Sequence, residues 1–321
     1  MPLKISSFQV QLSDGATLVY LSQACDHVDF SQNAIAFTEL SYIKRIPKKL
    51  LNLKLNCMKI RNYISLLVRR TLPEVYNTYH GYQKLKLPEN IQRINNLIIQ
   101  KHGLVVQRGP FAGMVHVGRK GGAALVPTLI GCYEEELHEI LGSVIQTNYD
   151  NIINVGSGEG YYAVGFALKI PTAKIYAFEI NPIARRMSKE MARANGVFDR
   201  IFFAGECDIK ALNEAIDKKS LVFMDCEGGE LDLLQPDLAP NLRYSDVLVE
   251  LHDFLNPTIS ETILSRFKET HDITLVSSTK RDPEAYTAIG FLNEEDRQIA
   301  VSEFRPAVMQ WAFMTAKSYQ K

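Results

Sequence analysis

A glycine-rich loop carries the clearest chemical signal in this chain of 321 residues. A short apolar run at 152–155 leads into the segment 156–160, which reads G-S-G-E-G, and a helical pattern follows it. Glycines allow backbone conformations with positive φ and let the chain approach a ligand closely, while a helix N-terminus offers free N–H groups. The cofactor-binding residues predicted in this loop are Gly156, Ser157, Gly158 and Gly160.

An acidic residue follows the next apolar run. Glu179 comes directly after residues 174–178 and 19 residues after Gly160. In open α/β sheets a carboxylate at this place accepts hydrogen bonds from ribose hydroxyls. The G-x-G-x-G spacing differs from the G-x-G-x-x-G of dinucleotide sites, and the chain has no P-loop lysine followed by Ser or Thr. The pattern therefore predicts a nucleoside-bearing cofactor that is neither a dinucleotide nor a nucleoside triphosphate.

Ionisable residues follow two further predicted strands. The fourth strand ends at Asp225 and Glu227, and the fifth contains Glu250 and runs into His252. Because the carboxyl ends of parallel strands share one edge of a sheet, we expect these four residues to surround the reacting centre. His252 is the predicted general base, since a neutral imidazole accepts protons near pH 7. Alternatively, Asp225, Glu250 and His252 hold a divalent cation that lowers the pKa of the acceptor.

Three other ionisable residues near this edge have other predicted roles. Asp253 is expected to cap the helix that follows it, and Glu230 to occupy the first turn of its own helix. Arg305, just before the last predicted strand, is a candidate for binding an anionic acceptor.

These motifs resemble those of the class I S-adenosylmethionine-dependent methyltransferases. The segment 156–160 is similar to that family's first motif, and Glu179 to its ribose-binding acid. Glu206 and Cys207 follow the third predicted strand, where the family contacts adenine. The segment 225–230, D-C-E-G-G-E, is similar to the D-x-E-G-x-E element of the FkbM-like methyltransferases, which include many O-methyltransferases of natural products and sugars.

The resemblance runs from about Gly109 to the C-terminus and implies S-adenosylmethionine as cofactor. It also implies methyl transfer to a small-molecule acceptor in secondary metabolism, with a hydroxyl oxygen as the expected nucleophile. Tyr161 and Tyr162 would lie beside the sulfonium, where an aromatic face favours positive charge. Three alternatives stay open: a cyclase or lyase of the azetidine-2-carboxylate type that releases methylthioadenosine, an RNA methyltransferase, and a non-enzymatic scaffold.

The spacing of the remaining elements predicts an α/β fold. From about residue 149, short apolar runs alternate with helical patterns, which is typical of a mostly parallel sheet. We expect a seven-stranded Rossmann-like methyltransferase sheet with an N-terminal α+β accessory region. The predicted strands are 152–155, 174–178, 200–204, 221–224, 247–251, 273–276 and 308–315, and the predicted helices are 161–169, 183–194, 209–217, 230–238, 259–269 and 293–303.

The N-terminal part has a different pattern, so we predict an accessory region over 1–145 and the cofactor-binding domain over 146–321. A hairpin is expected at 8–21 around Asp14-Gly15, a helix at 87–101 and a second hairpin at 104–117. The accessory region would serve as a lid, an acceptor pocket or a homodimer interface.

Composition excludes several classes of protein. Lys plus Arg and Asp plus Glu both number 36, so no global charge attracts nucleic acid or an anionic membrane. A stretch at 44–70 is rich in Lys and Arg, and we interpret it as a helical surface facing water. The five cysteines contain no C-x-x-C pair, and no apolar window of about 18 residues or signal core occurs. We therefore expect a cytoplasmic protein that does not cross a membrane.

Overall fold

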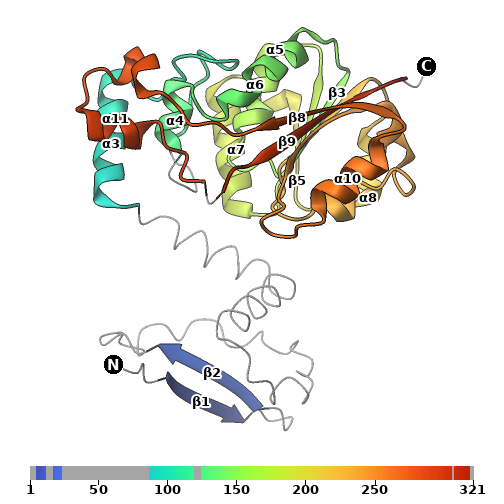
Figure 1. Cartoon of the computed structure of the whole chain (residues 1–321), viewed down its shortest axis with the longest axis horizontal. Helices are drawn as coiled ribbons and strands as arrows, with labels where there is room; N and C mark the ends of the chain where they lie inside the picture. Colours follow the sequence, from blue (N-terminus) through green and yellow to red (C-terminus); the bar gives the residue numbers. More distant parts are fainter. Residues whose placement is uncertain (1–4, 12–16, 24–86, 119–123, 306, 319–321) are drawn as a thin grey trace. The chain divides into compact units, whose positions relative to one another are not determined.

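The computed structural model describes residues 5–11, 17–23, 87–118, 124–305 and 307–318. The chain forms two compact units, Met1–Pro73 and Glu74–Lys321. In the first unit, β1 (Ile5–Gln11) pairs antiparallel with β2 (Thr17–Gln23), which confirms the predicted strand pairing (Figure 1). The turn between these strands and the basic stretch at 44–70 lie outside the described residues.

The second unit contains a seven-stranded sheet in the order β5-β4-β3-β6-β7-β9-β8. The first five strands in this order are parallel, and β9 is antiparallel to both of its neighbours. Every residue of the central strands β3, β6 and β7 is buried, as expected for parallel strands covered on both faces. The strands are β3 (Asn151–Val155), β4 (Lys174–Phe178), β5 (Ile201–Ala204), β6 (Ser220–Met224), β7 (Asp246–Leu251), β8 (His271–Ser277) and β9 (Gln310–Ala316).

Helices cover both faces of this sheet, so the unit has three layers (Figure 1). On one face α5 (His138–Gln146), α6 (Tyr161–Lys169) and α7 (Pro182–Ala194) pack into one apolar cluster with the sheet. On the other face α8 (Ile209–Ala215) and α10 (Ile259–Phe267) pack into a second cluster. No helix within the described ranges is long and apolar enough to cross a membrane.

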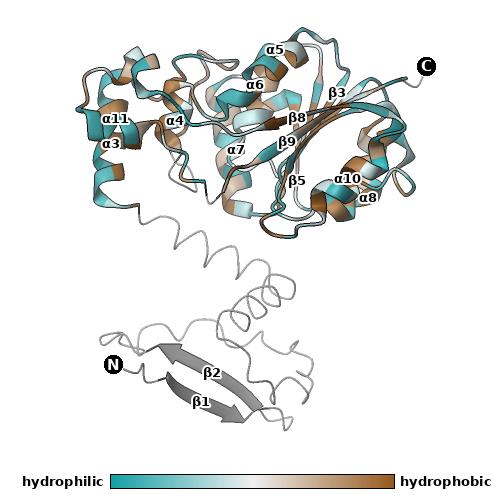
Figure 2. Cartoon of the chain, viewed as in Figure 1, coloured by the Kyte–Doolittle hydropathy of each residue, from teal (hydrophilic) through white to brown (hydrophobic). Residues whose placement is uncertain are grey.

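A group of helices beside the sheet forms what we call the cap. It comprises α3 (Glu89–His102), α4 (Leu125–Ile130), the short 3-10 turns at Pro283–Ala285 and Thr287–Ile289, and α11 (Glu294–Ala300). All of these elements except the turn at Pro283–Ala285 contribute residues to a third apolar cluster. Polar and apolar residues alternate along α3 in Figure 2, because only one side of that helix faces the cluster. The cap thus joins segments from both ends of the second unit.

The structure differs from the sequence prediction in four places. The predicted second hairpin is reduced to one bridge between Val105 and Val115. Helices α4 and α5 were not predicted, and α9 (Glu230–Leu233) is shorter than the predicted 230–238. The unit boundary lies at Pro73 rather than at 145, because Phe111 and Leu141 belong to the same core as the sheet. The predicted order of the remaining helices and strands of the sheet is confirmed.

Candidate functional site

The glycine loop connects β3 to α6 and passes close to the end of β6 and to α7. Gly156 has φ +78° and Gly160 has φ +98°, which are conformations that favour glycine. A Cβ at Gly156 would overlap the carbonyl oxygen of Asp225, and one at Gly160 would overlap the side chain of Ser188. Backbone conformation and close approach therefore both require glycine at these two positions.

Glu179, directly after β4, fixes this loop. Its Oε2 accepts a hydrogen bond from Gly158 N at 2.7 Å, and its Oε1 accepts one from Asn181 N at 2.7 Å. Burial raises the pKa of Glu179, while these two hydrogen bonds favour its ionised form. The carboxylate thus lies beside the loop, at the place where a ribose is predicted to bind.

The loop has room for a ligand. A Cβ added to Gly158 would meet no heavy atom within 4 Å, so this glycine faces open space. Ser157 is buried, and its hydroxyl oxygen has no hydrogen-bond partner within the part of the chain that the structure describes. Open space beside a buried, unsatisfied polar atom fits a nucleoside-bearing cofactor.

The other predicted cofactor residues lie in different environments. Tyr161 and Tyr162 are buried at the start of α6, and the Tyr162 ring packs on Phe223 with the centroids 4.1 Å apart. Cys207 is half-buried after β5, whereas Glu206 is exposed. Their contacts with a cofactor remain predictions.

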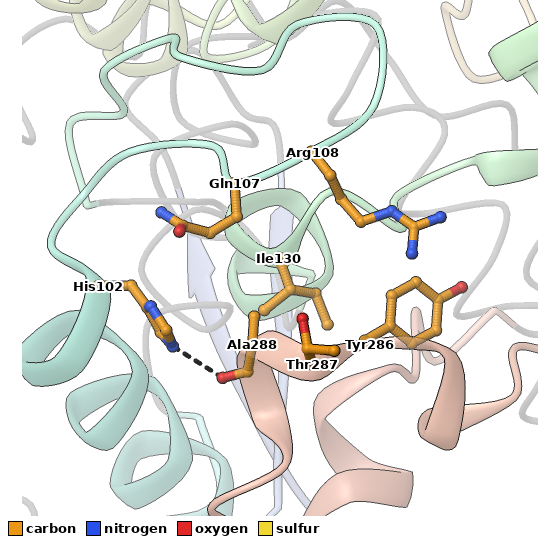
Figure 3. Close-up of a pocket in the computed structure, with 7 residues that line it drawn as sticks. All are labelled: His102, Gln107, Arg108, Ile130, Tyr286, Thr287 and Ala288. Atoms are coloured by element: carbon orange, nitrogen blue, oxygen red, sulfur yellow. Dashed lines mark hydrogen bonds between the residues drawn. The ribbon is translucent and has the colours of Figure 1, made fainter.

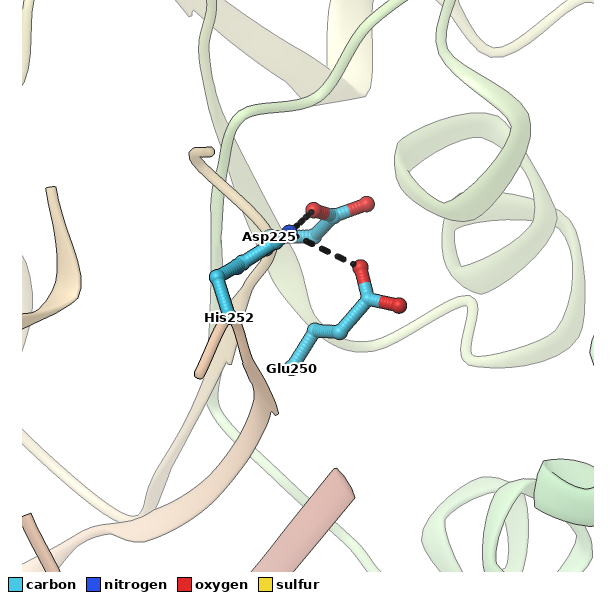
Figure 4. Close-up of side chains that lie close together, drawn as sticks. All are labelled: Asp225, Glu250 and His252. Carbon is cyan, nitrogen blue, oxygen red and sulfur yellow. Dashed lines mark ion pairs between the residues drawn. The ribbon is translucent and has the colours of Figure 1, made fainter. Parts of the chain in front are cut away.

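Asp225, Glu250 and His252 lie together at the carboxyl edge of the sheet (Figure 4). His252 Nε2 is 3.5 Å from Asp225 Oδ1 and 3.3 Å from Glu250 Oε2. Asp225 follows β6, whereas Glu250 lies in β7 and His252 follows it. One potential ligand atom from each residue lies within 4.8 Å of the other two. Glu227, the fourth predicted catalytic residue, is exposed and is not part of this cluster.

Glu230 lies on the other side of the imidazole. It begins α9 and is fully buried, and its Oε1 lies 2.9 Å from His252 Nδ1. Burial alone would lower the pKa of His252, but Glu230, Glu250 and Asp225 raise it to about 11. Burial and the neighbouring Glu250 raise the pKa of Asp225 well above its usual value. The acidic neighbours therefore favour the protonated form of the imidazole.

Arg305 also contacts this cluster, and the sequence did not predict that contact. Its Nη1 donates to Glu250 Oε1 at 2.6 Å, its Nη2 to Glu134 Oε1 at 2.5 Å and its Nε to Glu303 Oε2 at 2.8 Å. All three of its nitrogens are thus engaged by carboxylates. This corrects the expectation that Arg305 serves an anionic acceptor.

Glu134 is the second residue that the sequence did not reveal. It is buried with φ +48°, a strained conformation for a residue with a side chain. It also accepts a hydrogen bond from the Tyr162 hydroxyl, which links the site to the start of α6. Burial raises the pKa of Glu134 to about 7, although Arg305 acts in the opposite direction. The run of three glutamates at 134–136 could have drawn attention to this residue. However, the run lies before the first strand of the sheet, so no strand end placed it near the site.

A hollow lies in the cap, lined by none of the residues of this cluster (Figure 3). It has a volume of about 280 Å³. Arg108 lies over the Tyr286 ring, 4.8 Å from its centroid, and His102 Nε2 is 2.7 Å from Ala288 O. The hollow contains none of the predicted site residues.

The strand order, the antiparallel β9, the glycine loop after β3 and the acid after β4 define a class. They are the features of the Rossmann-like, class I methyltransferases, whose cofactor is S-adenosylmethionine. Within this class, residues 127–231 match the model of a family described as O-methyltransferase.

Individual proteins of known name match parts of the chain. A release factor glutamine methyltransferase from Chlorobaculum tepidum is 31% identical over 106 residues, which is 32% of this chain and 33% of the relative. The chain thus matches about a third of the length of this curated relative.

Two solved structures are similar to larger parts of the chain. TomG, an O-methyltransferase from Streptomyces achromogenes, is 13% identical with a TM-score of 0.36, covering 82% of this chain and 100% of TomG. A putative O-methyltransferase from Klebsiella pneumoniae is 12% identical with a TM-score of 0.36, covering 76% and 97% of the two chains.

Proposed function

We propose that this protein is an S-adenosylmethionine-dependent methyltransferase that methylates a hydroxyl oxygen of a small molecule, such as a natural product or a sugar. The observation that carries the proposal is the cluster of Asp225, Glu250 and His252 on the same sheet edge as the glycine loop. The O-methyltransferase family match and the D-x-E-G-x-E resemblance support oxygen as the acceptor atom.

The reaction requires an in-line displacement. The acceptor oxygen forms a bond to the methyl carbon, the bond from that carbon to sulfur breaks, S-adenosylhomocysteine leaves and the hydroxyl proton passes to water. The protein therefore has to align donor and acceptor and to stabilise the oxygen as its proton departs. The glycine loop and Glu179 would hold the donor, and the residues that follow β6 and β7 would face the acceptor.

We further propose that Asp225, Glu250 and His252 bind a divalent cation. Both ring nitrogens of His252 face carboxylates, with Nδ1 near Glu230 and Nε2 near the other two. A metal-binding histidine commonly has its second nitrogen held by a carboxylate in this way. In addition, Asp225 Oδ1 has no hydrogen-bond partner within the described residues.

The crowding of acidic groups supports the same assignment. Four carboxyl groups lie around two cationic side chains in this cluster: Glu134, Asp225, Glu230 and Glu250 face His252 and Arg305. A divalent cation bound among these oxygens would lower the pKa of an acceptor hydroxyl. The geometry favours this role for His252 over that of general base.

Product analysis tests the methyl transfer. The full chain is incubated with S-adenosylmethionine, first alone and then with a panel of small aromatic and sugar alcohols, and the products are separated by mass. We expect S-adenosylhomocysteine together with an acceptor that has gained one methyl group. Methylthioadenosine formed without acceptor would instead identify the cyclase or lyase reaction, and the methyltransferase proposal would be abandoned.

Metal removal tests the cation. We expect a chelator to inactivate the wild-type protein and Mg²⁺ or Mn²⁺ to restore its activity. His252→Ala should lower turnover by about 10- to 100-fold and leave the affinity for S-adenosylhomocysteine within about threefold. Full turnover in excess chelator would contradict the cation proposal while leaving the methyl transfer intact.

A further inference from the structure

We propose that Arg305 is a positioning residue that holds Glu250 in the orientation needed to bind the cation. This inference rests on the proposed cation site and assigns a role to a residue outside it. Arg305 lies in the loop between α11 and β9 and comes from neither of the strands that carry the candidate ligands.

The two oxygens of Glu250 have different partners. Oε1 accepts from Arg305 Nη1 at 2.6 Å, while Oε2 lies 3.3 Å from His252 Nε2. Because Oε1 is engaged, rotation of the carboxylate is restricted and Oε2 stays directed at the imidazole. The guanidinium therefore determines which oxygen faces the cluster of candidate ligands.

Arg305 is itself fixed from two further directions. Nη2 donates to Glu134 and Nε to Glu303, whose other oxygen accepts from Arg281 Nη2 at 2.8 Å. Arg281 also pairs with Glu136. These partners are largely buried, with side-chain exposures of 1% for Glu134 and 8% for Glu303. A planar fork that binds three carboxylates in fixed directions is a geometry that a lysine cannot reproduce.

The backbone beside this network is strained. The three described non-glycine residues with positive φ include Glu134 itself and Phe304, which precedes Arg305 and has φ +52°. Such conformations persist where surrounding contacts enforce them, and they concentrate at functional sites. Both strained residues thus lie where the network meets the candidate site.

Mn²⁺ affinity tests the inference without an acceptor. Calorimetric titration of the full chain with Mn²⁺ compares the wild type with Arg305→Lys, which keeps the charge and loses the fork. We expect about tenfold weaker binding, the usual effect of removing a residue that orients a metal ligand. Arg297→Lys is the matched control, because it makes the same exchange at an arginine that pairs with Glu284, outside this network. Its Mn²⁺ affinity should stay within about threefold of wild type.

A second variant separates orientation from charge. Arg305→Gln removes a positive charge, so electrostatics alone would tighten Mn²⁺ binding, whereas loss of orientation weakens it. We expect weaker binding, with S-adenosylhomocysteine affinity unchanged in every variant as a check on folding. Unchanged Mn²⁺ affinity in Arg305→Lys, tighter binding in Arg305→Gln, or equal loss in Arg297→Lys would overturn the inference. A wild-type protein that binds S-adenosylhomocysteine but no Mn²⁺ would instead overturn the cation site itself.

Discussion

At the scale of single residues, the carboxylate of Glu179 holds the glycine loop and is also the predicted ribose ligand. Its carboxylate already accepts backbone hydrogen bonds from Gly158 and Asn181, and each oxygen keeps a second lone pair for a ribose hydroxyl. The residue therefore shapes the loop before any cofactor binds, and its removal affects both the loop and the ligand contact.

We expect Glu179→Ala to weaken binding of S-adenosylhomocysteine by about 1.5–3 kcal/mol, the scale of a hydrogen bond to a charged group. Calorimetry measures the difference. Glu214→Ala is the control, because Glu214 is exposed on α8 and is not one of the predicted cofactor residues. If Glu179→Ala and this control bind equally well, Glu179 is not the ribose acid.

At the scale of elements, the sequence predicted those residues that directly follow strands. Asp225 and His252 come immediately after apolar runs, and a parallel sheet brings such positions to one edge, so their proximity to Glu250 followed from periodicity alone. The same reasoning could not place Glu134 or Arg305. Both lie in irregular segments, where side-chain position depends on tertiary contacts and no repeating pattern indicates it.

Helix packing at Gly165 in α6 also depends on tertiary contacts. A Cβ there would come within 2.5 Å of the Phe111 ring, whereas a Cβ at Gly142 in α5 would meet no heavy atom within 4 Å. Both glycines lie in helices without positive φ, so an alanine differs between them only in its surroundings. The segment containing Phe111 therefore packs against α6 because residue 165 has no side chain.

We expect Gly165→Ala to lower the free energy of unfolding by about 1–2 kcal/mol, because overpacking outweighs the gain in helix propensity. Gly142→Ala should raise it by about 0.5–1 kcal/mol. Urea unfolding followed by circular dichroism measures both variants. A stabilised Gly165→Ala would mean that Phe111 moves aside at little cost, and the packing described here would not be tight.

At the scale of the whole molecule, the division at Pro73 separates the described hairpin from everything that forms the candidate site. The three apolar clusters of the described residues begin at Ile94, and the candidate ligands, the glycine loop and Arg305 all lie beyond it. The cap belongs to the second unit, since Arg93 in α3 pairs with Asp296 in α11. The range 74–321 thus contains all three apolar clusters of the described residues and both ends of the cap.

We therefore expect a fragment of residues 74–321 to fold cooperatively. It should bind S-adenosylhomocysteine within about threefold of the full chain, because removal of residues 1–73 leaves the predicted cofactor contacts in place. Calorimetry on the fragment and the full chain tests this, and Arg93→Ala in both forms serves as a control for the attachment of the cap. Turnover of the fragment with any acceptor found for the full chain then shows whether the first unit contributes to acceptor binding. A fragment that aggregates or binds no cofactor would show that the first unit is required for the fold of the second.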